Sequence, residues 1–398
     1  MKILYFTHYG ALYGANKSLL NLLEGLEEYK FGALVIIPRE GDFSKALEQK
    51  QIPFLIFSFS WWCGEEKKPY GAKWRTIVAN IKKRRKYQRD LLLNKTRLEV
   101  LNKQINHYNP DFVFSNSSVF NFGLLYSQRY RIPHIWCLRE ALEHYSFKWF
   151  YSEHYVTRSF NASDIVIAVS KFLQERYKVK HQVKNIQVLY NGVLSIKRLL
   201  RIDERRKNPS KSDHEGLIFG VVGLIHPKKG QREAIEAFHL VKKKSPNSRL
   251  LIVGEGDTRE LQELVKFFEL ENSVEFWGHV KDPFEAFLEM DVALTCSRNE
   301  GLGRVTLEAM ATALPVIGYN EGGTKELILN HKTGLLYEGS STDLAEKMLY
   351  LVRNPDHRRE MGKFARTMFE KNYTSEVYAK NFVQIIEEFR SSQLRSRI

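Results

Sequence analysis

The chain has 398 residues, of which 43% are apolar, and it carries a formal net charge of +15 at pH 7. This length exceeds what one hydrophobic core usually supports, so we expect two domains. The apolar runs fall well short of the roughly 18 residues that a membrane-spanning helix needs. The apolar block at residues 3–6 is also too short for a secretion signal, and we therefore expect a cytoplasmic protein.

The first half of the chain alternates short apolar segments with helix-length stretches, which is typical of parallel sheets built from strand-helix-strand units. The expected strands span residues 3–6, 33–37, 54–57, 112–114, 134–138 and 165–169. This alternation predicts an α/β domain over residues 1–197.

A charged segment at residues 198–216 contains Pro209 and has no apolar period in its second half, so we expect an interdomain linker there. After it the alternation restarts and predicts a second doubly wound domain over residues 217–374. Its expected strands span residues 217–222, 250–253, 274–277, 292–295 and 315–318. Residues 375–398 carry apolar side chains close to helical spacing, which predicts a closing helix that packs across the domains.

The segment SRNEGLGRVTLE at residues 297–308 follows one of these strands and is the most informative in the chain. Gly301 and Gly303 allow a tight turn and the close approach of a ligand. The helix that begins after them presents amides that favour an anion, so we expect a phosphate there. Glu300 and Glu308 can hold two ends of one ligand.

The motif continues into AMATALPVIGYNEGGTKELI, where the paired glycines at residues 322–323 open another turn that is compatible with a phosphate. This ordered set resembles the retaining family-4 glycosyltransferases, whose signature is E-x7-E followed by an EAMA-type helix and a PVI strand. The resemblance implies the α/β GT-B fold, in which two Rossmann-like doubly wound domains face each other across a cleft. It also implies a nucleotide-diphosphate sugar as the donor.

Further landmarks occur in the order that the family shows. The segment GLIHPKKG at residues 223–230 resembles the loop whose lysine, here Lys229, contacts the donor phosphates. The resemblance implies a donor-binding set of Gly14, Lys229, Val280, Glu300, Gly301, Gly303, Arg304, Val305 and Glu308. It places Asn16, Lys17 and Asn191 on the acceptor side or in the cleft.

The sequence departs from the family at two places. Many members carry an arginine after the glycine of the phosphate loop, whereas this chain has Leu224. Many also place a catalytic-site histidine where this chain has Arg139 and Glu140, and we expect His134 and His144 nearby to be structural. The candidate catalytic residues are therefore Glu300, Lys229, Arg139 and Glu140. A catalytically silent partner subunit with the same fold is an alternative.

The expected chemistry is the departure of a nucleoside diphosphate, which places negative charge on its β-phosphate. By resemblance, Glu300 would bind sugar hydroxyls and Glu308 the ribose, and the product would retain the configuration of the donor. The chain has no Asp-x-Asp pattern, so we expect protein charge to take the place of a metal and no cofactor to be needed. A glycosidase with two carboxylates fits less well, because it needs neither the Lys229 loop nor the glycine turns.

Residues 67–103 are strongly basic, with 13 Lys/Arg and 2 Asp/Glu. Trp74, Ile77, Val78 and Ile81 fall at helical spacing, and a cationic run follows at residues 82–86. Such a helix can rest on an anionic membrane surface or hold a phosphorylated lipid carrier, although a solvated helix face is an alternative. Nucleic-acid binding is a weaker alternative, because no recognised motif accompanies the charge.

These features predict a glycan or a polyprenyl-phosphate-linked molecule as the acceptor. The family-level expectation is bacterial surface-polysaccharide synthesis at the inner face of the cell membrane, with no nucleic acid as a partner.

Overall fold

The computed structural model describes the chain except for residues 66–72, 143–146, 208–215 and 396–398. The chain forms two compact units. Unit 1 comprises Met1–Asn191 together with Tyr378–Ile398, and unit 2 comprises Gly192–Val377. The polypeptide therefore leaves unit 1 once and returns to it at its C-terminal end.

Unit 1 is built on a seven-stranded sheet in the order β3-β2-β1-β5-β6-β8-β9, in which all the pairings are parallel. Its strands are β1 (Lys2–Phe6), β2 (Gly32–Ile37), β3 (Phe54–Ile56), β5 (Phe112–Ser115), β6 (His134–Leu138), β8 (Ile165–Ala168) and β9 (Ile186–Val188). A separate antiparallel pair joins β4 (Cys63–Glu65) and β7 (Phe147–Trp149). The central strands are buried along almost their whole length, as is expected of a parallel sheet covered on both faces.

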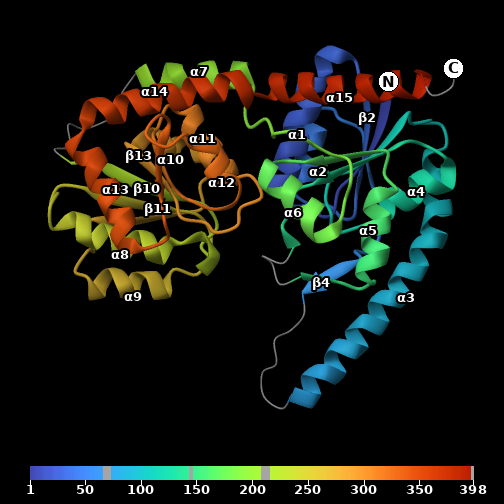
Figure 1. The fold of residues 1–398 in the computed structure, drawn as a ribbon, viewed down its shortest axis with the longest axis horizontal. Helices are drawn as coiled ribbons and strands as arrows, with labels where there is room; N and C mark the ends of the chain where they lie inside the picture. The colour runs from blue at the N-terminus through green and yellow to red at the C-terminus, as the bar shows by residue number, and fades with distance from the viewer. Residues whose placement is uncertain (66–72, 143–146, 208–215, 396–398) are drawn as a thin grey trace. The chain divides into compact units, whose positions relative to one another are not determined.

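Helices connect these strands and cover the sheet (Figure 1). They are α1 (Gly14–Leu26), η1 (Glu27–Tyr29), α2 (Asp42–Gln49), α3 (Lys73–Ile105), α4 (Phe122–Tyr130), α5 (Glu153–Asn161), α6 (Lys171–His181) and α15 (Ser375–Arg395). The returning helix α15 packs on the sheet, since Phe382 and Phe389 lie 5.8 and 6.0 Å, between ring centroids, from Phe114 and Phe112 of β5.

Unit 2 is built on a six-stranded parallel sheet in the order β12-β11-β10-β13-β14-β15. Its strands are β10 (Ile218–Val222), β11 (Arg249–Val253), β12 (Val274–Gly278), β13 (Val292–Thr295), β14 (Val316–Tyr319) and β15 (Gly334–Tyr337). The core includes Phe219, Phe238, Ile252, Leu294 and Ile317, all at most 1% exposed. These residues come from strands and from α8, so one core lies between the sheet and its helices.

The helices of unit 2 lie on both faces of this sheet (Figure 1). They are α7 (Ile196–Lys207), η3 (Pro227–Lys229), α8 (Gln231–Lys242), α9 (Arg259–Phe267), α10 (Pro283–Glu289), α11 (Arg304–Ala311), α12 (Gly322–Leu327), α13 (Ser341–Arg353) and α14 (Pro355–Asn372). Two doubly wound α/β units therefore make up the chain, which confirms the predicted fold class. In the described part of the chain, no helix combines the length and the apolar character that crossing a membrane requires.

The predicted linker differs from the structure in its first part. Residues up to Lys207 form the helix α7, which begins at Ile196. Leu199 and Ile202 are buried, and Arg366 of α14 binds Asp203 of α7 through two nitrogens at 3.1 and 2.7 Å. The many charges of this segment therefore occupy the outer side of an amphipathic helix that belongs to unit 2. Residues 208–215 of the predicted linker lie outside the described residues.

All the strands expected from the sequence are present, and the described residues form four further strands that were not expected. The short strands β9 and β15 each lie at an edge of a sheet. The pair β4 and β7 joins segments that are more than 80 residues apart in the sequence. Segments of three or four residues are too short to show a periodicity of their own.

Candidate active site

The loop after β10 places Lys229 at the end of the short helix η3. His226 precedes this helix and accepts a hydrogen bond from the Lys228 backbone N–H through Nδ1, at 3.1 Å. The Gln231 side chain then donates to the Leu224 carbonyl at 2.9 Å, which ties the start of α8 to the beginning of the loop. Lys229 is consequently held at its backbone, while its side chain stays 34% exposed.

The loop after β13 carries the other charged groups that the sequence singled out. Gly303 adopts a left-handed conformation with φ 93° and precedes the first residue of α11. Gly301 lies in the loop, and Arg304 and Val305 form the first turn of the helix. Glu308 lies one turn further along. The predicted donor-binding residues of this segment therefore share one loop and one helix.

Lys229 and Glu300 meet although 71 residues separate them in the sequence. The Lys229 ammonium donates a hydrogen bond to Glu300 Oε1, and the side chain of Glu300 is 21% exposed. The structure thus brings together two groups that were expected to bind different parts of one donor. The exposure of both side chains leaves them accessible to a ligand.

A second ion pair joins Arg304 and Glu308 within α11. Arg304 Nε donates to Glu308 Oε1 at 2.8 Å, and the side chains are only 20% and 7% exposed. Arg304 also donates to the Val193 carbonyl at 3.3 Å. A cation in the first turn of a helix opposes the helix dipole, so Arg304 needs such partners. It holds the buried carboxylate of Glu308 in one orientation.

The paired glycines 322 and 323 pack directly on the loop that carries Glu300. Gly323 N–H donates to the Glu300 carbonyl at 2.8 Å. A Cβ atom at Gly322 would lie 2.9 Å from Glu300 backbone atoms, and one at Gly323 would lie 2.5 Å from Leu302 Cα. Close packing between the two loops therefore requires these glycines and fixes the position of Glu300.

In unit 1, Gly14 is the first residue of α1 and is exposed, and a Cβ added there would meet no atom within 4 Å. Lys17, one turn along the same helix, is half-buried. Asn16 differs from the expectation that it faces a ligand, because it is completely buried. Its amide nitrogen donates to the carbonyls of Tyr9 and Ala11 at 2.9 and 2.8 Å, so Asn16 holds the loop before α1 in place.

Arg139 lies buried at the carboxyl end of β6. Its guanidinium donates to Asn116 Oδ1 at 2.8 Å, to Asn191 Oδ1 at 2.7 Å and to the Tyr378 hydroxyl at 3.2 Å. Asn191, which was expected in the cleft, is itself only 8% exposed. These bonds fasten β6 to the end of unit 1 and to α15, and they give Arg139 and Asn191 positioning roles.

Glu140 follows Arg139 and accepts hydrogen bonds from three groups. Oε1 accepts from the Ser117 hydroxyl at 2.8 Å, and Oε2 accepts from the Ser118 hydroxyl and backbone N–H at 3.0 and 3.2 Å. Burial raises the pKa of Glu140 above its usual value, while these bonds and the charge of Arg139 oppose the shift. Glu140 therefore orders the loop after β5.

Two histidines of unit 1, His134 and His144, were predicted to be structural. His134 is completely buried between the hydroxyls of Ser115 and Ser163, at 2.9 and 2.8 Å, which agrees with a structural role. His144 lies outside the described residues. The sequence did not single out His8, which lies two residues after the end of β1, near the edge of the sheet where ligands of parallel sheets bind.

Val280 lies half-buried between β12 and α10, outside the two charged loops. Within the described residues, no three His, Cys, Asp or Glu side chains come together as a metal site would require. The structure therefore groups Lys229, Glu300, Arg304 and Glu308 in unit 2 as the candidate site.

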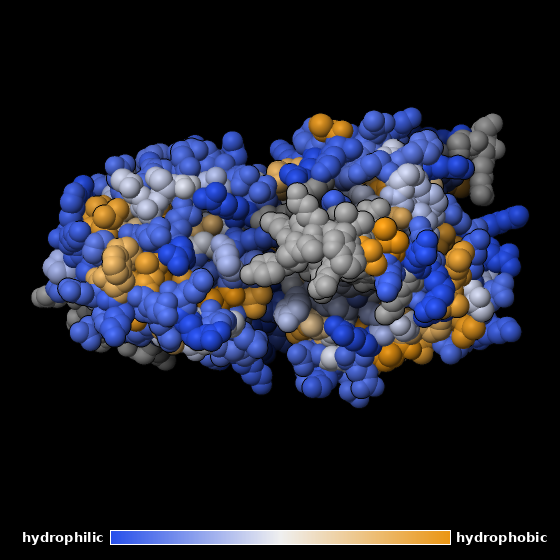
Figure 2. Space-filling view, turned by 90° about the horizontal axis from the view of Figure 1, so that it is seen from below, coloured by the Kyte–Doolittle hydropathy of each residue, from blue (hydrophilic) through white to orange (hydrophobic). Residues whose placement is uncertain are grey.

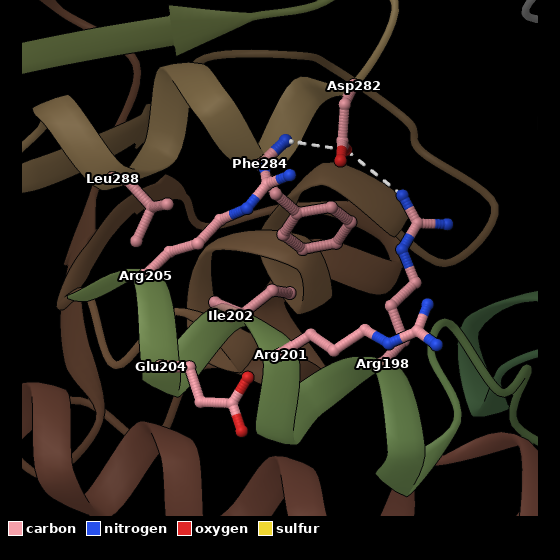
Figure 3. A pocket seen from close by; sticks show the side chains of 8 residues that line it. All are labelled: Arg198, Arg201, Ile202, Glu204, Arg205, Asp282, Phe284 and Leu288. Carbon is pink, nitrogen blue, oxygen red and sulfur yellow. Dashed lines mark hydrogen bonds and ion pairs between the residues drawn. The ribbon is translucent and has the colours of Figure 1, made fainter. Parts of the chain in front are cut away.

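A hollow of about 620 Å³ in unit 2 contains none of the predicted site residues (Figure 3). It lies between α7 and the start of α10, where Arg198 binds Asp282 at 3.0 Å and covers the ring of Phe284. Arg205 lies 3.9 Å from Glu285. Because Arg198 and Arg205 already have acidic partners in Asp282, just before α10, and Glu285 of α10, we interpret this hollow as the outer margin of the contact between the two helices.

Two family models match the chain. Residues 14–194 match the model described as Glycosyltransferase Family 4, and residues 202–368 match the model described as Glycosyl transferases group 1. The capsular polysaccharide biosynthesis glycosyltransferase CapM of Staphylococcus aureus is 29% identical over 227 residues, which are 55% of this chain and 60% of CapM. The N-acetyl-α-D-glucosaminyl L-malate synthase of Bacillus anthracis is 30% identical over 227 residues, 56% of this chain and 59% of the enzyme.

The chain thus spans about 60% of the length of these curated relatives. Among solved structures, Anabaena HepE in complex with UDP has a TM-score of 0.77 at 21% identity, covering 98% of this chain and 100% of HepE. At this identity the likeness shows the fold alone. The two parallel α/β units and this likeness define the fold as GT-B. Since the two family models together match both units, the chain belongs to the glycosyltransferases of the family-4, group-1 type.

Proposed function

We propose that the protein is a retaining, metal-independent glycosyltransferase that moves a sugar from a nucleoside-diphosphate donor to a hydroxyl of a glycan or lipid-linked acceptor. The observation that carries the proposal is the contact between Lys229 and Glu300 beside the start of α11. One cation, one carboxylate and a helix start then lie close together in unit 2. This combination suits a sugar linked to a diphosphate.

In the proposed reaction the bond between the sugar C1 and the β-phosphate oxygen breaks, and a bond between the acceptor oxygen and C1 forms. Lys229 and the amides at the start of α11 stabilise the negative charge on the leaving phosphate. The leaving phosphate takes the proton of the acceptor hydroxyl. Since attack and departure occur on the same face of the sugar, the configuration at C1 is retained.

The pair of Lys229 and Glu300 is compatible with donor binding. An ammonium group has three N–H donors, so Lys229 can keep Glu300 as a partner while it donates to a phosphate oxygen. Glu300 also keeps acceptor capacity for a sugar hydroxyl. We therefore assign Lys229 to the diphosphate and Glu300 to the transferred sugar, with Lys229 linking the two.

Glu308 is assigned to the ribose. The side chain is nearly buried and its Oε1 is held by Arg304, so its orientation is fixed before a donor binds. A carboxylate offers about four acceptor sites, which leaves capacity for the two ribose hydroxyls. Fixing a binding group in advance lowers the entropy lost on binding.

The first donors to test carry uridine. HepE has been solved in complex with UDP and, in another structure with a TM-score of 0.72, with UDP-glucose. We propose surface-polysaccharide synthesis as the setting, which the similarity to CapM, a glycosyltransferase of capsular polysaccharide biosynthesis, supports.

The helix α3 supports a location at the cytoplasmic face of a membrane. Leu98 and Leu101 near its C-terminal end are buried, whereas Leu92 is 66% exposed and Val78 and Ile81 are also exposed. The cations Lys82, Arg85 and Arg89 are exposed on the same stretch of the helix.

Figure 1 shows this part of α3 extending from the body of unit 1, and Figure 2 shows that hydrophobic residues are interspersed among hydrophilic ones on the visible surface. Exposed apolar side chains among cations suit the interface of an anionic membrane.

The experiment is hydrolysis and transfer by the purified protein with UDP-glucose, UDP-galactose, UDP-N-acetylglucosamine and GDP-mannose, each with and without EDTA. We expect one donor to be consumed at a rate that EDTA leaves unchanged, and the anomeric configuration of the product, read by NMR, to match that of the donor. A rate that EDTA abolishes, or an inverted product, would contradict the proposed mechanism.

A further inference from the structure

Aromatic rings gather around the carboxyl end of β1 in unit 1. The ring centroid of Tyr9 lies 3.8 Å from that of His8 and 5.8 Å from that of Tyr13, and Trp61 lies 5.5 Å from His8. Tyr13 is 65% exposed, and Tyr9 and Trp61 are half-buried. This cluster of His8, Tyr9, Tyr13 and Trp61, which we call the aromatic cluster, therefore presents ring surface to solvent.

His8 is the polar member of the aromatic cluster and is only 7% exposed. Its Nδ1 has no hydrogen-bond partner among the described residues. Burial, with a contribution from the nearby charge of Arg139, lowers the pKa of His8 to about 3, so the imidazole is neutral at physiological pH. A buried polar atom without a partner is unfavourable, and a hydroxyl of a ligand would supply the partner.

The aromatic cluster is held in place by hydrogen bonds to the backbone. Trp61 Nε1 donates to the His8 carbonyl at 3.1 Å, and Asn16 Nδ2 donates to the Tyr9 carbonyl at 2.9 Å. The loop between β1 and α1 and the segment that carries Trp61 are thereby fixed to each other. A ligand would meet rings that are already positioned, which favours binding.

We propose that the aromatic cluster is a binding subsite for one sugar ring of the acceptor. A pyranose has a face of C–H groups and an edge of hydroxyls. The negative face of an aromatic ring attracts polarised C–H groups, and a neutral imidazole nitrogen can exchange a hydrogen bond with a hydroxyl. This inference rests on the proposed function, because that function makes a carbohydrate acceptor the expected occupant.

The aromatic rings therefore match the C–H face of a sugar ring, and the imidazole nitrogen of His8 matches its hydroxyl edge. A nucleobase would also stack on aromatic rings, but the charged groups assigned to the nucleotide sugar, Lys229, Glu300 and Glu308, belong to unit 2. A lipid chain would use the rings and leave His8 Nδ1 without a partner. A sugar ring satisfies both features of the aromatic cluster.

The test is saturation-transfer-difference NMR with the methyl glycosides of glucose, galactose and N-acetylglucosamine, which carry no lipid tail. Tyr13→Ala is the first variant, because its exposed side chain can be removed without disturbing the core. Tyr29→Ala, an exposed tyrosine of η1 in the same unit, is the matched control. Since Tyr13 supplies the most exposed ring of the aromatic cluster, we expect Tyr13→Ala to weaken binding of the preferred glycoside about tenfold.

Donor hydrolysis without acceptor, measured on the same variants, separates this proposal from the proposed function. We expect Tyr13→Ala and His8→Gln to hydrolyse the donor at the wild-type rate while the acceptor KM rises. Glycoside binding that is absent, or equal in Tyr13→Ala and Tyr29→Ala, would overturn the subsite even if donor hydrolysis is normal. Binding of octyl but not methyl glycosides would indicate a lipid site and would also overturn it.

Discussion

The charged groups of the two units are arranged differently. In unit 2, Lys229 pairs with Glu300 and Arg304 pairs with Glu308, so cations and carboxylates satisfy one another. In unit 1, the guanidinium of Arg139 is buried and bound to two amides and a hydroxyl. The pairs of unit 2 can add a ligand as a further partner, whereas the partners of Arg139 are part of the fold.

The candidate catalytic residues of unit 2, Lys229 and Glu300, can therefore be distinguished by experiment from Arg139 of unit 1. Exposed ion pairs contribute little to stability, so the pairing of Lys229 with Glu300 needs a functional reason. A buried cation that loses its hydrogen-bond partners destabilises the folded state. Removing the cation instead leaves its buried partners without hydrogen bonds, which is also destabilising. Substitutions at Lys229 and Glu300 should therefore affect turnover, and substitutions at Arg139 should affect stability.

The largest effect is expected at the Lys229 and Glu300 pair. Removing one group that stabilises developing charge typically lowers kcat about 10²–10³-fold. We expect Lys229→Ala and Glu300→Ala each to lower kcat of sugar transfer by about that factor, with unfolding free energies close to that of the wild type. The neighbouring substitution Lys228→Ala is the control and should change kcat by less than about threefold. An equal loss of kcat in Lys228→Ala would contradict the catalytic role of Lys229.

A substitution of Arg139 tests the expectation that its buried hydrogen bonds stabilise the fold of unit 1. Arg139→Met removes three hydrogen bonds and leaves Asn116, Asn191 and Tyr378 without this partner. We expect the free energy of unfolding in urea to fall by about 3 kcal/mol. Arg158→Met, at an exposed position of α5, should change it by less than about 0.5 kcal/mol. A fully stable Arg139→Met protein with no transfer activity would instead make Arg139 catalytic.

The buried histidine His134 makes the stability of the fold depend on pH. Burial lowers its pKa to about 3, against 6.5 for the unperturbed side chain. Between these values the unfolded chain binds a proton that the folded chain does not, so stability is lost as pH falls from 6.5 towards 3. The loss is at most about 1.4 kcal/mol per pH unit for one such histidine.

We therefore expect His134→Gln to have a flatter dependence of unfolding free energy on pH between 6 and 4 than His154→Gln, whose histidine is exposed. The measurement is urea unfolding at several pH values. Parallel curves for the two variants would show that His134 does not titrate on unfolding.

Glu308 should affect binding more than turnover. Because its carboxylate is assigned to the ribose, we expect Glu308→Ala to raise the donor KM about tenfold, equivalent to about 1.4 kcal/mol, with kcat changed less than threefold. The control is Glu346→Ala, at an exposed position of α13. A kcat loss as large as that of Glu300→Ala would contradict the division of roles between the two glutamates.

The smallest effect is expected on α3. One cation near an anionic surface contributes about 1 kcal/mol, so Arg85→Ala should weaken partition into phosphatidylglycerol vesicles about fivefold at low salt. Lys45→Ala on α2 is the control for an exposed cation of the same unit. If the protein does not bind the vesicles, or if salt does not weaken the binding, the membrane role of α3 is contradicted. The exposed cations of α3 would then belong to a solvated helix face.

The sequence was sufficient for those parts of the fold that have local signals. Long apolar segments predicted the central strands, and the glycines and glutamates of residues 297–308 predicted a loop followed by a helix. The charge of residues 198–207 hid the helix α7, because its buried side is narrow and includes only Leu199 and Ile202 among its apolar residues. A local pattern of charge cannot show which side of a helix will be covered.

The site was only partly predictable for the same reason. The pair of Lys229 and Glu300 depends on two loops that the sheet brings together, and the burial of Asn16 depends on the loop that folds over it. His8 carries no motif of its own and is defined by the rings around it. Contacts between distant segments arise from tertiary packing, which a single sequence does not specify.

Calorimetric titration of the purified protein with UDP tests the central claim most directly, because it requires neither the acceptor nor the transferred sugar. The account predicts binding at one site, unchanged by EDTA and weakened about tenfold or more by Lys229→Ala, with Lys228→Ala close to the wild type. No binding of UDP or of any other nucleoside diphosphate, or an affinity that is the same in both lysine variants, would contradict it.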